Sequence, residues 1–228
     1  ALKGEQTDGT NHTMLSYKDF RHAVSLSIDR QAFTKTVSPA SSAGYGLLNY
    51  SYISNPETGE KFRSCPQAVN AICRFYGTDT IEDITGYDKE SAAELFTRAY
   101  RQALKDGTIS KTDTITVNFL TYDAGPGAIK YLSFIQDAVN AASAGTDLAG
   151  RIVFKQVTDE NAFQNIGRGK GDMTITAWGG GTYDPYSVLW CYSVPDVLLE
   201  YGFNPDRERL TINIDGVHVT KSYHEWYT

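Results

Sequence analysis

Between residues 88 and 178 the apolar positions of the chain follow two different periods. Over 88–106 and over 126–144 they recur every three or four residues, which predicts two helices that each bury one face. Over 113–120, 151–157 and 172–178 they alternate with polar residues, which predicts three half-buried strands. On these patterns the side chains expected in the core are Leu95, Phe96, Leu132, Ile135, Ile152 and Ile175.

The order of these elements predicts the fold class. A helix over 126–144 and a short one over 159–166 separate the three strands, so each strand is joined to the next by a crossover, and crossovers join parallel strands. Near the end of the chain, Asp215-Gly216 stands between alternating apolar residues, a pattern typical of an antiparallel hairpin with a type I′ turn. We therefore expect an α/β fold with a mixed β-sheet flanked by helices. No linker interrupts the pattern, which indicates a single domain over 1–228.

The chain is less regular before residue 88. Residues 1–15 are polar and are expected to be irregular. Ser16 and Asp19 have the spacing of a capping box and predict the start of a helix, and Asp29 is expected to cap a second helix through Val37. Residues 38–59 are rich in glycine, serine, tyrosine and asparagine, which indicates a long loop.

Composition and charge narrow the classes of partner. The net charge of −6 over 228 residues argues against nucleic acid, which favours a basic face. No apolar run approaches the roughly 18 residues needed to span a membrane. Cys65, Cys73 and Cys191 are an odd set without the spacing of metal ligands, so we expect no metal and no other cofactor. Buried free thiols are favoured over a disulfide to Cys191.

The strongest candidate for a ligand site is the loop that follows the third predicted strand. In open α/β sheets ligands bind beyond the carboxyl ends of the strands, and this strand ends at Trp178 and continues as Gly-Gly-Gly-Thr-Tyr-Asp-Pro. Glycines let a ligand approach the backbone closely, and aromatic side chains offer broad apolar faces. The expected ligand-binding residues are Trp178, Gly179, Gly180, Gly181, Thr182 and Tyr183. The alternative is a flexible loop beside a buried Trp178.

No catalytic motif is present in the sequence. Gly167–Gly171 resembles a phosphate-binding loop, but Gly171 stands where a metal-binding Ser or Thr would follow the lysine, and the segment precedes a strand. There is no Gly-x-Ser-x-Gly elbow and no His-Glu-x-x-His pair. We therefore expect no catalytic residues. An α/β enzyme domain with Asp172 or Asp184 as a base is an alternative.

Two stretches of the chain, 20–37 and 171–188, together resemble a known family. In this order they resemble the extracytoplasmic solute-binding proteins of peptide ABC transporters, the oligopeptide- and dipeptide-binding proteins of family 5 type. The residues that match the helix signature of the family, and then its strand, tryptophan and acidic–proline loop, are Arg21, Ala23, Ile28, Asp29, Arg30, Gly171, Asp172, Met173, Trp178, Asp184 and Pro185.

The resemblance implies a two-lobed, periplasmic-binding-protein-like protein, of which this chain is the second large lobe, cut from a longer sequence. It implies the substrate-binding component of an ABC importer, which captures a peptide or a similar small solute in the interlobe cleft and works with a membrane permease. It also implies an extracytoplasmic location, as a cell-surface lipoprotein or in the periplasm, and no enzymatic activity. A non-transport adhesive or structural surface domain is the other alternative.

Gly181 departs from the pattern of the family. Peptide-binding members often carry an Asp at this place, where it pairs with the α-amino group of the ligand, an interaction of about 1.5–3 kcal/mol. Either another carboxylate replaces it in this protein, or the ligand has no free amino terminus. Asp184 is expected to cap or brace the loop ahead of Pro185 rather than to contact ligand.

Overall fold

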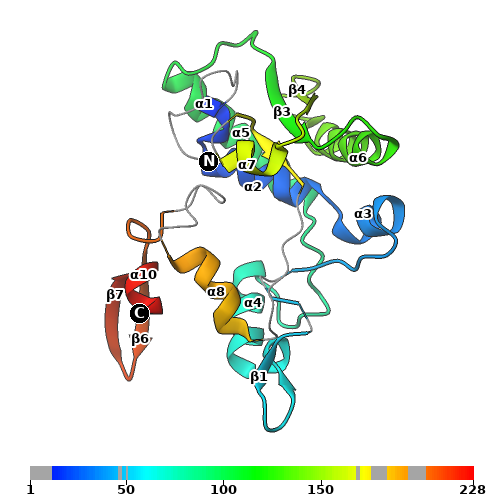
Figure 1. Cartoon of the computed structure of the whole chain (residues 1–228). Coiled ribbons are helices and arrows are strands. Elements are labelled where there is room, and N and C mark those ends of the chain that lie inside the picture. Colours follow the sequence, from blue (N-terminus) through cyan, green and yellow to red (C-terminus); the bar gives the residue numbers. More distant parts are fainter. Residues whose placement is uncertain (1–11, 46–47, 50, 168–169, 176–183, 195–203) are drawn as a thin grey trace. The chain divides into compact units, whose positions relative to one another are not determined.

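The computed structural model describes residues 12–45, 48–49, 51–167, 170–175, 184–194 and 204–228. The chain falls into two compact units, whose elements are labelled in Figure 1. Of the described residues, the first unit contains 12–45 and those within Glu82–Ile175, and the second contains those within Gly46–Ile81 and Thr176–Thr228. The expectation of a single domain over 1–228 stays a prediction.

The first unit contains the three-stranded parallel sheet expected from the sequence. β3 (Ile115–Thr121) lies in the centre, β4 (Ile152–Thr158) on one side and β5 (Met173–Thr174) on the other. Every residue of β3 pairs with the successive residue of β4, so this ladder has no bulge. β5 starts one residue after the predicted 172–178, whose last three residues lie outside the described part of the chain.

Three helices follow the predicted pattern. α5 (Lys89–Lys105) and α6 (Pro126–Ser143) confirm the two long helices, and α7 (Ala162–Gly167) confirms the short one. α5 begins where the Asp88 carboxylate accepts a hydrogen bond from the backbone N–H of Ser91 at 2.9 Å. α6 begins with a proline, which suits the first helical position because no donor is needed there.

Three further helices form the amino-terminal part of the first unit: α1 (His12–Leu15), α2 (Lys18–Ser27) and α3 (Arg30–Val37). The expectation of an irregular segment is therefore wrong for the turn of α1. Asp29 caps α3 as predicted. Its carboxylate accepts hydrogen bonds from the backbone N–H groups of Gln31 and Ala32, each at 3.0 Å.

The capping box expected at Ser16 and Asp19 is wrong. Tyr17 is the N-cap residue of α2, and its side chain makes no capping hydrogen bond. The Asp19 carboxylate instead accepts a hydrogen bond from Nε of Arg98 on α5, at 2.9 Å. The Asp19 carboxylate therefore binds Arg98 of another helix, instead of the backbone at the start of α2 as the local pattern predicted.

The core of the first unit joins its helices to one face of the sheet. Phe20 of α2 and Phe96 of α5 meet edge to face, with ring centroids 5.6 Å apart, and neither side chain is exposed. Four of the expected core residues are confirmed as buried: Leu95, Phe96, Ile135 and Ile152. Leu132 is only partly buried, at the margin of this core.

Ile175 is the one expected core residue that the structure contradicts. Its side chain is 44% exposed. The pairing between β3 and β5 ends at Leu120 and Thr174, so no ladder hydrogen bond holds Ile175 on the face where Met173 packs against the core. The alternation of apolar and polar residues in the sequence thus extends beyond Thr174, the last residue of β5, so the alternation alone overestimated the length of the strand.

The second unit contains short elements. Two strands pair with each other: β1 (Ile53–Asn55), which lies within the long loop expected over 38–59, and β2 (Glu60–Lys61), which directly follows it. The expectation of a loop is therefore wrong for β1. A 3₁₀ turn (Phe62–Ser64) leads into α4 (Pro66–Tyr76), which the sequence did not predict. Cys65, the N-cap residue of α4, and the buried Cys73 are both free thiols, so neither forms a disulfide.

The second unit also contains α8 (Pro185–Ser193), the hairpin of β6 (Arg209–Ile214) and β7 (Val217–Ser222), and α10 (Tyr223–Tyr227). Asp215 and Gly216 have φ values of 51° and 86°, as a type I′ turn requires, which confirms the hairpin. Among the described residues the hairpin is a two-stranded sheet of its own, and the sheet of the first unit is wholly parallel. The α/β fold with a parallel sheet flanked by helices is therefore confirmed, but the hairpin does not make that sheet a mixed one.

Gln136 of α6 covers the outer edge of β4. Its side-chain amide donates to the carbonyl oxygen of Ile152 at 2.9 Å, and its carbonyl oxygen accepts from the backbone N–H of Phe154 at 2.8 Å. A neighbouring strand would make the same pair of hydrogen bonds. Edge strands with unpaired backbone groups invite pairing with other chains, so this single side chain protects the edge where it is most buried.

We expect Gln136→Ala to destabilise the protein by about 1–3 kcal/mol, because two partly buried backbone groups of β4 lose their partners. Hydrogen exchange at the Phe154 amide should accelerate more than exchange at amides in the middle of β3. Gln102→Ala, which removes an exposed glutamine side chain of α5, is the control. Unchanged protection of the Phe154 amide in Gln136→Ala would show that this contact is not maintained in solution.

Candidate functional site

The candidate site is the carboxyl edge of the parallel sheet, where β3, β4 and β5 all end. The predicted ligand-binding residues follow β5 directly in the sequence. They are Trp178, Gly179, Gly180, Gly181, Thr182 and Tyr183, and all of them lie outside the described residues. Their role stays a prediction. The structure does describe both flanks of this loop and the neighbouring strand ends.

The flank before the loop is anchored to β3 by Asp172. Its carboxylate accepts a hydrogen bond from the backbone N–H of Asn118 at 2.7 Å, and its own N–H donates to the carbonyl oxygen of Asn118 at 2.9 Å. The side chain thereby supplies an acceptor that the short strand β5 does not provide. An aspartate at this position fixes where the strand leading to the loop begins.

Gly171 and Thr174 complete this anchor. A Cβ atom at Gly171 would lie 2.8 Å from both methyl carbons of Leu120, so only glycine fits beside that buried side chain. The hydroxyl of Thr174 donates to the carbonyl oxygen of Leu120 at 2.8 Å. The Gly171-Asp172-Met173 stretch therefore packs the start of β5 against β3 in this protein.

The flank after the loop is the beginning of α8, in the second unit. The carboxylate of Asp184 accepts a hydrogen bond from the backbone N–H of Tyr186 at 3.0 Å, and Pro185 occupies the first turn. Asp184 therefore caps a helix, as predicted. Tyr186 stacks on Tyr227, with ring centroids 4.4 Å apart, and donates to its carbonyl oxygen at 3.2 Å.

Polar side chains fix the ends of β3 and β4. The amide of Gln156 donates to the hydroxyl of Thr121 at 2.9 Å and to the carbonyl oxygen of Asp123 at 3.1 Å. Thr121 Oγ1 donates to the same carbonyl oxygen at 2.7 Å, and the backbone N–H of Asp159 donates to the Thr121 carbonyl oxygen at 2.9 Å. The backbone at this edge is therefore held at several points.

Asp159 is ionised at neutral pH and builds the turn after β4. Its carboxylate accepts from the side-chain amide of Asn165 at 2.7 Å and from the backbone N–H of Asn161 at 2.8 Å. The hydrogen bond from Asn165, followed by the one from Asn161, lowers the pKa of Asp159 below its ordinary value. We therefore assign Asp159 to the structure of the edge.

Tyr122 is the residue at this edge that the sequence reasoning missed. It follows the last residue of the central strand, and its side chain is 67% exposed. Ile175, at the end of the neighbouring strand, is also exposed. The signal in the sequence was an aromatic residue two positions after the end of the predicted half-buried strand 113–120.

The residues of the matching helix stretch lie in the first unit and make structural contacts. Arg21 donates to the carbonyl oxygen of Leu15 at 2.6 Å. Arg30 donates to the carbonyl oxygen of Gly44 at 3.0 Å, and its guanidinium lies 5.8 Å from the ring centroid of Tyr45. This signature therefore shapes the fold around α2 and α3.

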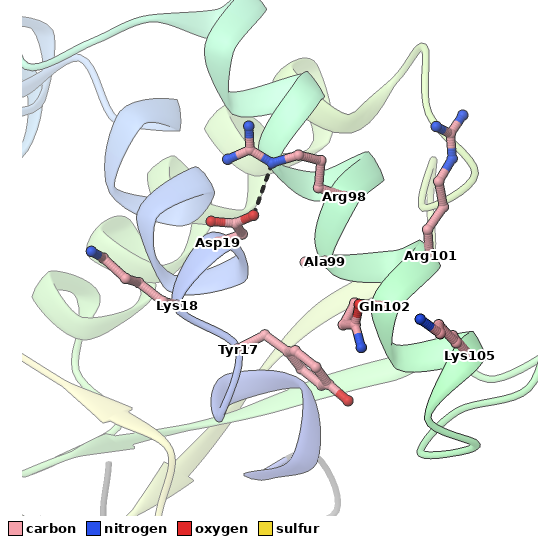
Figure 2. Close-up of a pocket in the computed structure, with 8 residues that line it drawn as sticks. All are labelled: Tyr17, Lys18, Asp19, Arg98, Ala99, Arg101, Gln102 and Lys105. Atoms are coloured by element: carbon pink, nitrogen blue, oxygen red, sulfur yellow. Dashed lines mark hydrogen bonds and ion pairs between the residues drawn. The ribbon is translucent and has the colours of Figure 1, made fainter.

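A surface groove of about 480 Å³ lies between α2 and α5. Figure 2 shows Arg98 and Asp19 pointing toward each other within it, while Lys18 and Arg101 extend away from one another, so its cations do not converge on one point. The groove is lined by Tyr17, Lys18, Asp19, Arg98, Ala99, Arg101, Gln102 and Lys105.

The groove lies near the amino ends of β3 and β4. Arg151, directly before β4, donates to the hydroxyl of Tyr100 on α5 at 3.1 Å and to the carbonyl oxygen of Asp113 before β3 at 2.6 Å. This half of α5 therefore sits at the edge opposite to the carboxyl edge. A smaller apolar hollow of about 230 Å³ lies in the second unit, lined by Leu48, Phe62, Arg63, Ala68, Ala71, Ile72 and Leu189.

Within the described part of the chain, His, Cys, Asp and Glu side chains form no group of three or more that could hold a metal ion. The helices described there also include none with the length and hydropathy of a membrane span.

Comparison with solved structures shows the fold. The oligopeptide ABC transporter substrate-binding domain of Bacillus anthracis matches with a TM-score of 0.56 and 18% identity, over 87% of this chain and 33% of that one. OppA of Listeria monocytogenes bound to peptide matches with a TM-score of 0.57 and 22% identity, over 86% of this chain and 34% of that one. NikA of Staphylococcus aureus in complex with Ni(L-His)2 matches with a TM-score of 0.51 and 19% identity, over 86% of this chain and 35% of that one. The chain thus spans about a third of the length of these proteins.

The family comparison covers most of the chain. No curated protein sequence matches it. The family model described as "Bacterial extracellular solute-binding proteins, family 5 Middle" matches residues 7–196, a range that includes both motif stretches and the candidate loop. The chain therefore belongs to the family 5 bacterial extracellular solute-binding proteins.

Proposed function

We propose that this chain forms part of the substrate-binding component of an ABC importer and that it binds a peptide or a similar small solute. The observation that carries the proposal is the anchoring of the candidate loop at each flank, by Asp172 on the sheet and by Asp184 on α8. Both anchors are carboxylates bonded to backbone amides, and they lie in the described residues before and after the predicted ligand-binding segment.

A peptide is the leading ligand class. Among the proteins of similar fold, the Bacillus anthracis domain belongs to an oligopeptide transporter and the Listeria OppA is bound to peptide, whereas the staphylococcal NikA is bound to a nickel–histidine complex. Since two of these three proteins are peptide proteins, we favour the peptide over the metal complex. The family is one of solute binding, and we propose that this protein carries out no catalytic step.

The proposed partner is a membrane permease that receives the ligand from the complete protein. Membership of an extracellular family supports a location outside the cytoplasm, in the periplasm or at the cell surface. We propose attachment to the membrane surface through a lipid anchor. Globomycin-sensitive processing and palmitate labelling of the complete protein test this attachment; unlabelled, freely released protein would contradict it.

The test of ligand binding uses the complete protein and a pentapeptide library, with native mass spectrometry to detect the bound peptides and calorimetry to measure affinity. We expect Trp178→Ala to weaken peptide binding by at least about tenfold, as removal of a central aromatic contact commonly does. Trp190→Ala, on α8 and 44% exposed, is the matched control and should change affinity less than about twofold.

A second comparison tests the position of Gly181. N-acetylation of the bound peptide should change its affinity by less than about threefold, because no carboxylate stands at Gly181 to pair with an α-amino group. A much larger loss would mean that another carboxylate binds the amine. Failure of the complete protein to bind any peptide of the library or any solute of a metabolite pool would sink the transport proposal and favour an adhesive or structural role.

A further inference from the structure

Tyr122 is an aromatic side chain held in an exposed position at the carboxyl edge of the sheet. Its side chain is 67% exposed, although the preceding residue, Thr121, is only 7% exposed. Among the described residues it makes no ring contact and its hydroxyl makes no hydrogen bond. The ring is therefore not part of the described core of the first unit.

The backbone on both sides of Tyr122 is fixed. The carbonyl oxygen of Thr121 accepts the backbone N–H of Asp159, and the carbonyl oxygen of Asp123 accepts both Thr121 Oγ1 and the amide of Gln156. These three hydrogen bonds are 2.9, 2.7 and 3.1 Å long. The backbone that carries Tyr122 therefore loses little conformational entropy when the side chain binds, which favours a preorganised contact.

Ile175 is a second exposed apolar side chain at this edge. Thr174 pairs with Leu120, where the described pairing of β3 with β5 ends. Because successive side chains of a strand alternate between its two faces, Ile175 continues the face of Met173, whereas Tyr122 continues the face of Leu120. Ile175 is 44% exposed and directly precedes the segment that leads to Trp178. Two exposed apolar side chains thus follow the ends of neighbouring strands, next to the start of the candidate loop.

We propose that Tyr122 is a specificity-determining residue, whose ring binds an apolar or aromatic side chain of the peptide ligand. This inference rests on the proposed function. The carboxyl edge of parallel strands is where open α/β sheets bind ligands, and the central strand is flanked at that edge on both sides. An aromatic ring there adds binding through burial and through edge-to-face or offset-stacked contacts with a ligand ring.

The test compares pentaalanine with a set of peptides in which one Phe replaces each Ala in turn, by calorimetry on the complete protein. The wild-type protein should prefer one Phe position over pentaalanine by about tenfold. Tyr122→Ala should abolish this preference and leave the affinity for pentaalanine within about twofold. Tyr122→Phe should retain the preference, because the ring and not the hydroxyl makes the contact.

Tyr87→Ala is the matched control, since Tyr87 is another exposed tyrosine of the first unit, 39% exposed, whose backbone carbonyl and N–H take part in a turn with Thr85. It should leave the Phe preference intact. A Phe preference that survives in Tyr122→Ala overturns this assignment while the proposed function stands. Absence of binding of all these peptides to the wild-type protein overturns the peptide-binding function itself, and the assignment with it.

Discussion

Phe96→Ala is expected to lower the free energy of unfolding by about 3–5 kcal/mol, the largest effect of any single substitution considered. Phe96 is fully buried on α5 and meets the equally buried Phe20 of α2 edge to face at 5.6 Å. Truncation removes the transfer free energy of the ring and leaves a cavity between two helices. Urea denaturation followed by circular dichroism at 222 nm measures the loss.

Phe75→Ala is the control for this substitution. Phe75 lies on α4 of the second unit and is 75% exposed, so the same chemical change should cost less than about 1 kcal/mol. Phe96→Leu should fall between the two, because it retains most of the apolar volume. Equal losses in Phe96→Ala and Phe75→Ala would contradict the core described for the first unit.

Gly171→Ala is expected to destabilise the protein by about 1–3 kcal/mol through overpacking. The added methyl group would lie 2.8 Å from both methyl carbons of Leu120, which is 1% exposed and cannot move toward solvent. Because Gly171 directly precedes the anchor residue Asp172, the substitution should also displace the start of β5. Peptide affinity of the complete protein should fall together with stability.

A double-mutant cycle with Leu120→Ala isolates this contact. Leu120→Ala removes the atoms that the new methyl group would meet, so the two substitutions together should cost less than the sum of their separate effects. Gly127→Ala on α6 is the control, since nothing lies within 4 Å of the position that its added methyl group would take, and alanine favours a helix. It should leave stability unchanged or raise it. Strict additivity of Gly171→Ala and Leu120→Ala would show that they do not touch.

The candidate loop illustrates what a sequence motif can and cannot reveal. The Gly-Asp-Met and Asp-Pro residues were recognisable as a pattern, yet their physical function came from the structure. Asp172 completes the hydrogen bonding of Asn118, which is 54 residues away in sequence. Asp184, by contrast, bonds an N–H only two residues on, and its capping function was predictable.

The sequence by itself determined the features that depend on near neighbours along the chain. The periods of α5, α6, β3 and β4, the cap at Asp29 and the hairpin turn at Asp215 all follow from interactions within a few residues. Local hydrogen bonds and the period of the apolar positions can be predicted without knowing which other elements pack against the helix or strand.

Only the tertiary structure decided which distant segments meet. It paired Asp19 with Arg98 in place of a local cap, placed Gln136 on the edge of β4, and gave the hairpin a sheet of its own. It also left Ile175 exposed where strand pairing ends. The physical reason is that hydrogen-bond partners and burial at these positions come from residues far along the chain, and no local period records them.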